Sequence, residues 1–119
     1  MIITDVSDKI QKGIEHLENG RKLLESMSDA LAVATGIYEK KLAMTLMGLK
    51  NGKEYELDGE KIVSPPASIM EKVARGICWQ EKMSLTASEG NMTRARIGMS
   101  SLEAELNAWQ SIFRHLSNV

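Results

Sequence analysis

Apolar residues recur at intervals of three or four residues near the C-terminal end of the chain, between residues 91 and 116. This is the spacing of one face of an α-helix, so the segment should be a helix that packs along an apolar stripe. The stripe holds one of the two tryptophans and the only phenylalanine of an aromatic-poor chain, and it should therefore be the main hydrophobic anchor. Its members are Met99, Leu102, Leu106, Trp109, Phe113 and Leu116.

A second helical pattern covers the first third of the chain. Four apolar residues stand seven residues apart, as in a coiled-coil seam: Leu17, Leu24, Leu31 and Tyr38. The pattern predicts one helix over residues 4–47, with an alternative break or bend at Gly20, because glycine weakens a helix interior. The candidate N-caps, whose side-chain oxygens can accept hydrogen bonds from the first turn, are Thr4, Asp5 and Ser7.

The chain changes character after this helix. Asn51-Gly52 indicates a turn where the helix ends. Asp58-Gly59 suits a two-residue type I′ turn, because both positions of that turn need a positive φ. The resulting register places Tyr55 opposite Ile62 and Glu56 opposite Lys61. We expect a β-hairpin near residues 53–63 that lies against the helices or pairs with another chain, since two strands alone are marginally stable.

A further helical region follows the hairpin. Ser64-Pro65-Pro66 resembles a helix start, and Ser68 has capping-box spacing to Glu71. The periodicity predicts near-continuous helix over residues 64–117. The alternative is a break at Gly90-Asn91, which would give a compact bundle of three helices.

These elements predict a single, mainly α domain over residues 1–119. It would be a long antiparallel helical hairpin or a small helical bundle, with a β-hairpin insertion near residues 53–63. Two long helices alone leave most side chains in water, so such a chain often completes its core by forming an oligomer. The aromatic end of the apolar stripe is too large for one hairpin to cover. The candidate oligomer interface consists of Trp109, Phe113, Leu106 and Leu116.

Charge and composition restrict the partners and the compartment. The formal net charge is −1, so no global basic field attracts nucleic acid or an anionic membrane. The single cysteine, Cys78, cannot form an internal disulfide, which fits a reducing cytoplasm. The N-terminus does not resemble a signal peptide, and no apolar run approaches the ~20 residues that span a bilayer. We therefore expect a cytoplasmic protein with no membrane partner.

Residues that carry chemistry are scattered. Neither His16 nor His115 has a carboxylate or cysteine at a spacing typical of metal ligands, and Cys78 has no nearby histidine. Glu103 and Glu105 point to different faces of their helix, whereas an acid–base pair must converge on one site. Glycine-rich phosphate loops are absent. We expect no catalytic, cofactor-binding or metal-binding residues, and we expect that the protein is not an enzyme.

Basic residues in the second half of the chain suggest another activity. The candidate nucleic-acid contacts are Lys72, Arg75, Arg94 and Arg96. Glutamates stand between them, and this mixture favours an ordinary solvated helix face over a phosphate-binding surface. Trp79 could stack on a base, whereas Trp109 fits a packing role better.

The stretch Ala74-Arg75-Gly76-Ile77 and residues 102–116 resemble small helical accessory proteins encoded in the early regions of tailed phages, near recombination or replication genes. The resemblance covers mainly residues 64–116, and the β-hairpin has no counterpart in it. It implies an intracellular accessory protein that acts in the cytoplasm of an infected host cell. It assigns no catalytic residue to any position.

Two functions compete on these grounds. The first is a non-enzymatic, oligomeric accessory protein that binds a host or phage protein, for example to inhibit a host nuclease or defence system. The second is a factor that binds or anneals single-stranded DNA during phage recombination or replication. The near-neutral charge favours the first, because binding to phosphates is electrostatic.

Overall fold

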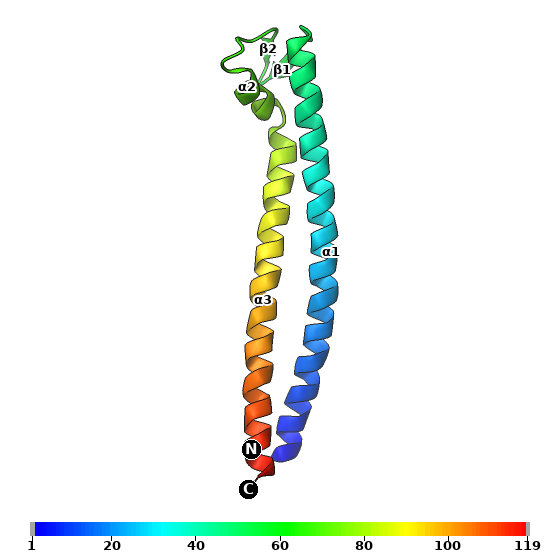
Figure 1. Cartoon of the computed structure of the whole chain (residues 1–119), viewed down its shortest axis with the longest axis vertical. Coiled ribbons are helices and arrows are strands. Elements are labelled where there is room, and N and C mark those ends of the chain that lie inside the picture. Colours follow the sequence, from blue (N-terminus) through cyan, green and yellow to red (C-terminus); the bar gives the residue numbers. More distant parts are fainter. Residues whose placement is uncertain (1, 119) are drawn as a thin grey trace. The chain divides into compact units, whose positions relative to one another are not determined.

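The computed structural model of the protein describes residues 2–118, most of which are helical (Figure 1). The elements in chain order are α1 (Ile3–Lys50), β1 (Tyr55–Leu57), β2 (Glu60–Ile62), α2 (Met70–Ile77) and α3 (Trp79–Ser117). The predicted mainly α architecture with a β-hairpin insertion is therefore confirmed.

The chain divides into two compact units. The terminal unit comprises Met1–Ser28 and Gly90–Val119, and the central unit comprises Asp29–Glu89. Both α1 and α3 contribute a segment to each unit. Each unit therefore contains one segment of α1 and one segment of α3.

In the terminal unit, the two segments run antiparallel, and the start of α1 lies at the same end as the end of α3 (Figure 1). The core consists of buried Leu17, Met99 and Leu106, with Ile10 and Leu102 packed against them. These α3 residues belong to the predicted apolar stripe, so the packing role of its N-terminal half is confirmed.

The same antiparallel arrangement recurs in the central unit. Its core consists of buried Tyr38, Cys78 and Leu85. The residues packed against them are Leu31, Ala34 and Leu42. Leu17, Leu31 and Tyr38 of the predicted seven-residue seam thus all contribute to hydrophobic cores.

Both helices continue through the glycines where a break was an alternative. In α1, a Cβ atom at Gly20 would collide with Met99, so the glycine allows close approach of α3. In α3, Gly90 lies within unbroken helix. Neither long helix contains a proline, so the backbone hydrogen bonds persist across these positions.

The end of α1 has a specific stop signal. Gly52 has a φ of 79°, in the left-handed region. The N–H of Lys53 donates to the carbonyl of Gly48 at 2.9 Å, and the N–H of Gly52 donates to the carbonyl of Leu49 at 3.2 Å. This is a Schellman motif, which satisfies the last carbonyls of the helix. The predicted turn at Asn51-Gly52 is confirmed.

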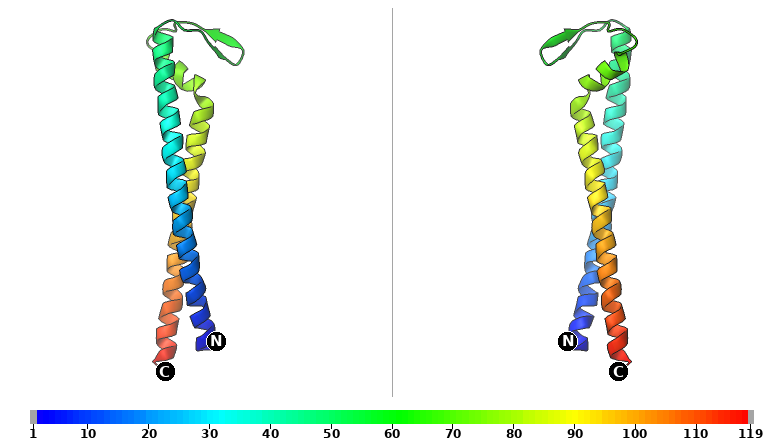
Figure 2. Two further views of the ribbon diagram at one scale, coloured as in Figure 1. Left: turned by 90° about the vertical axis from the view of Figure 1, so that its right-hand side faces the viewer. Right: turned by 90° about the vertical axis from the view of Figure 1, so that its left-hand side faces the viewer.

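The β-hairpin has the predicted turn and register. Asp58 and Gly59 both have positive φ, and Tyr55 pairs with Ile62. Figure 2 shows the hairpin projecting to one side of the end of α1 within the central unit. The Tyr55 side chain lies against Gly48 of α1, and Leu57 approaches Gly76 of α2. The hairpin is therefore attached to both helices.

Three local predictions about helix ends are wrong. The first helix begins at Ile3, so Thr4, Asp5 and Ser7 lie inside it and not before it. The predicted helix start at Ser64–Ser68 is also wrong, because α2 begins at Met70 and Ile69 provides no side-chain cap. Two successive prolines bias the residues before them away from helical conformation, and this delays the helix until after Pro66.

The third error concerns continuity. The predicted helix over residues 64–117 is interrupted at Cys78, which has φ −90° and ψ 22°. Its N–H still donates to the carbonyl of Ala74, so the chain bends without losing that hydrogen bond. The bend places the Cys78 side chain in the core and α2 against β1. Tertiary packing therefore overrides the helical periodicity at this point.

The open surroundings of Gly36 and the close contact of Gly20 with Met99 allow a stability test. A Cβ at Gly36 would meet nothing within 4 Å, so Gly36→Ala should increase the free energy of unfolding by up to about 1 kcal/mol. Gly20→Ala should not show this increase in the free energy of unfolding, because the buried Met99 side chain must move. Urea unfolding followed by far-UV circular dichroism measures both values, and equal gains would contradict the close-approach explanation.

Candidate interaction surfaces

A row of exposed apolar side chains lies on α1 in the central unit. We call it the outer stripe, and it consists of Val33, Ile37, Met44 and Met47. Each of these side chains is 55–62% exposed. With Lys40 they follow the alternating spacing of four and three residues that is typical of a coiled-coil seam.

The outer stripe is distinct from the core-facing side of α1. At 3.6 residues per turn, its members span an arc of roughly 80°, centred about 150° from the Tyr38–Leu42 side. This part of α1 is therefore apolar on two nearly opposite faces, and its own unit covers only one of them. Next to the stripe is a hollow of about 340 Å³, lined by Ala30, Val33, Ala34, Ile37, Glu81 and Ser84.

The terminal unit contains a larger apolar groove between its α1 and α3 segments, which we call the terminal groove. Its volume is about 530 Å³. Its large apolar residues are Leu23, Met27, Met99 and Leu102, and its small residues are Gly20, Ala95, Gly98 and Ser101. Arg94 and Glu105, eleven residues apart on α3, also line it and add opposite charges. The groove thus combines an apolar surface with one acidic and one basic side chain.

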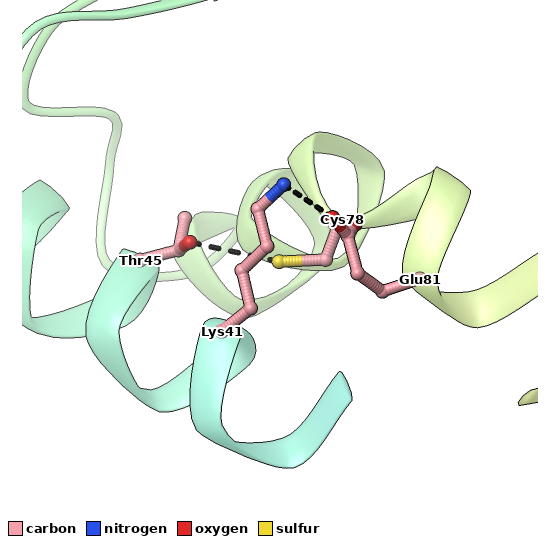
Figure 3. Close-up of polar contacts among 4 residues, drawn as sticks. All are labelled: Lys41, Thr45, Cys78 and Glu81. Carbon is pink, nitrogen blue, oxygen red and sulfur yellow. Dashed lines mark hydrogen bonds and ion pairs between the residues drawn. The ribbon is translucent and has the colours of Figure 1, made fainter. Parts of the chain in front are cut away.

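A polar cluster connects α1 to the bend between α2 and α3 in the central unit (Figure 3). Lys41 Nζ donates to Glu81 Oε1 at 2.7 Å, and the Thr45 hydroxyl lies 3.5 Å from Cys78 Sγ. Cys78 is fully buried and Thr45 nearly so. These contacts secure the bend against α1, which is a structural role.

The ion pair changes the acidity of both partners. The hydrogen bond from Lys41 lowers the pKa of the Glu81 carboxyl below its ordinary value of 4.5, although burial acts in the opposite direction. The same hydrogen bond raises the pKa of Lys41 above its ordinary value of 10.5. Glu81 Oε2 is buried and accepts no hydrogen bond, so the ion pair is the main compensation for burying this carboxylate.

The predicted oligomer-interface residues differ in their surroundings. Leu106 is only 8% exposed and belongs to the core of the terminal unit. The other three, Trp109, Phe113 and Leu116, are half-buried. Phe113 lines a hollow of about 400 Å³ with Ile10. The structure therefore leaves part of this aromatic end accessible.

The four predicted nucleic-acid contacts are divided between the two units, two in each. Lys72 and Arg75 are exposed on α2 in the central unit, and Arg94 and Arg96 are exposed on α3 in the terminal unit. Arg75 donates to Glu71 at 2.7 Å, and Arg94 donates to Asn91. Two of the four cationic side chains, both of them arginines, therefore already have a polar partner within the chain.

The outer stripe was missed by sequence reasoning, although a signal was present. The spacing of Val33, Ile37, Met44 and Met47 is as regular as that of the seam through Leu31 and Tyr38.

Residues 2–118, the part of the chain that the structure describes, include no group of three or more histidine, cysteine or acidic side chains placed to hold a metal ion. Among the described helices, none has the length and apolar content needed to cross a membrane.

Comparisons with protein-family models, curated proteins and solved structures find no match to this chain.

Removal of the Lys41–Glu81 ion pair should have a small, pH-dependent effect. Glu81→Gln should lower the free energy of unfolding at neutral pH by about 0.5–1 kcal/mol. Because the pKa of Glu81 is lowered on folding, its contribution is complete above pH 4.5 and is lost as the pH falls through the lowered pKa. The difference between wild type and variant should therefore disappear in acid.

Glu71→Gln is the matched control, because it removes an exposed pair on a single helix. Its effect should not exceed about 0.5 kcal/mol. Urea titrations at a series of pH values test both variants. A pH-independent effect of Glu81→Gln would contradict an electrostatic origin.

The burial of Cys78 predicts slow chemical modification. Its side chain has no exposed surface, so a thiol reagent can reach it only when the central unit opens. In native buffer, Cys78 should react far more slowly than in denaturant, as measured with a chromogenic disulfide reagent. Equally fast reaction in both conditions would show that the bend between α2 and α3 is not stably packed.

Proposed function

We propose that this protein is a non-enzymatic helical accessory protein that acts by binding another protein through the outer stripe of α1. The observation that carries the proposal is the exposure of Val33, Ile37, Met44 and Met47 at coiled-coil spacing on one helix face. Apolar surface arranged in this way is typical of a binding site for another amphipathic helix.

Lys40 specifies the kind of helix that fits. It stands within the outer stripe, between Ile37 and Met44. A parallel pair of identical stripes would bring two lysines together, whereas a partner helix with an acidic residue at this level would form an ion pair. The expected partner is therefore an apolar helix of a different protein, with a carboxylate that faces Lys40.

A more specific form of this proposal is that the chain is encoded by a phage and inhibits a host nuclease or defence system. The resemblance of residues 64–116 to phage early-region proteins supports this form. Gene neighbourhood is the direct test. Adjacent recombination or replication genes would support this version, and an unrelated neighbourhood would count against it.

Binding through the outer stripe can be tested with a double variant. Val33→Glu with Ile37→Glu should weaken capture of the partner from cells that express the protein by roughly 100-fold or more, since each buried aliphatic side chain contributes about 1.5–3 kcal/mol. Both side chains are more than half exposed, so the helical content should be unchanged. Lys40→Glu should also weaken capture, through charge repulsion.

Ser28→Glu with Ala32→Glu is the control, because it adds the same two charges, also four residues apart, to exposed positions on another face of α1. This control should capture the partner like wild type. Equal capture by the Val33–Ile37 variant and the control would contradict the proposal. Salt-sensitive retention of single-stranded DNA, lost on Arg75→Glu with Arg94→Glu, would favour the nucleic-acid function instead.

A further inference from the structure

We propose that the terminal groove binds a second copy of this chain, so that two α3 helices pair antiparallel about a two-fold axis between Met99 and Ser100. The inference goes beyond partner binding by the outer stripe, because it uses a different unit and a different surface. It rests on the proposed function only in treating the chain as an interaction protein.

The sequence of α3 around this point is complementary to its own reverse. Residues 94–105 read Arg-Ala-Arg-Ile-Gly-Met-Ser-Ser-Leu-Glu-Ala-Glu. In an antiparallel pair of identical helices, each residue faces the one equally far beyond the centre. On the contact face, Arg94 then faces Glu105 of the other copy, and Gly98 faces Ser101. Opposite charges and similar sizes meet at every one of these levels.

The lining of the terminal groove shows which face of α3 would form this pair. Arg94, Gly98, Ser101 and Glu105 all line the terminal groove. A Cβ at Gly98 would meet nothing within 4 Å, so another helix can come close to the α3 backbone here. Arg96 and Glu103 lie roughly 140–160° around the helix from Gly98, away from the groove. Of the two complementary charge pairs, only Arg94–Glu105 can therefore act across the groove.

Apolar surface on this side supplies the remaining contact. Ile97 is 62% exposed, next to the groove, and Leu23 on the α1 wall is 52% exposed. A second α3 helix in the groove would remove both from water and would bring two Arg94–Glu105 pairs together, one on each side of the axis. Pairing with a copy of the same chain covers the apolar surface and places each charge opposite a side chain of the other sign, because the surface is complementary to itself.

Charge reversal provides the decisive experiment on the full chain. Wild type should form a dimer in sedimentation velocity over micromolar concentrations. Arg94→Glu or Glu105→Arg alone should raise the dimer dissociation constant at least tenfold, because like charges then face each other twice. The two variants mixed together should form a heterodimer, since each then faces the opposite charge, and Arg94→Glu with Glu105→Arg in one chain should restore the homodimer.

Two matched controls separate the groove from general effects of charge and volume. Arg96→Glu with Glu103→Arg makes the same charge changes on the far side of α3 and should leave the dimer unchanged. Gly98→Leu should block the dimer by filling the groove, whereas Gly36→Leu, at another open helical glycine, should not. Circular dichroism confirms that each variant keeps its helices.

A monomeric wild type, or a dimer that survives both single charge reversals, would overturn the inference. Equal loss of the dimer in the Arg96–Glu103 control would overturn it as well. These outcomes are independent of the outer stripe, because the dimer variants leave Val33 and Ile37 unchanged. Retention of the partner by Arg94→Glu would support the proposed function even if this dimer does not form.

Discussion

The structure depends on one geometric constraint: a layer of two helices can bury only one face of each helix. In both units, a segment of α1 packs against a segment of α3, and the cores are small clusters around Leu17, Met99 and Leu106 or around Tyr38, Cys78 and Leu85. Glycines at the terminal contact bring the helices close enough to make these clusters dense, since Gly13 and Gly20 lie directly against Leu106 and Met99. All other apolar side chains of the pair must remain in water or find cover elsewhere.

The functional proposals follow from this constraint. The outer stripe and the terminal groove are surfaces that a two-helix layer leaves uncovered, and each has an electrostatic feature that restricts its partner. Lys40 in the outer stripe favours a different, acidic helix, whereas Arg94 and Glu105 in the groove favour the same helix in reverse. In the two proposals, self-association uses α3 and binding of another protein uses α1, so the two surfaces share no residues.

Much of the fold could be predicted from the sequence, because its signals are local. Asp58-Gly59 and Gly52 need positive φ, and this determines the hairpin register and the end of α1. The bend at Cys78 could not be predicted, because it depends on contacts with Thr45, 33 residues away, and with the hairpin. The outer stripe was missed for a related reason. When a helix has two regular apolar faces, periodicity alone does not show which face its neighbour will cover.

The hairpin affects how the protein can assemble, because a sheet of only two strands has two unpaired edges. Such edges can recruit further strands and begin uncontrolled aggregation. Here each strand is three residues long, and charged Glu56, Glu60 and Lys61 are exposed along them. Short, charged edges are poor templates for β-addition, so the hairpin can project from the helices and still leave association to their side chains. In the proposed assembly, growth is then limited by surfaces that close on a second copy or on one partner.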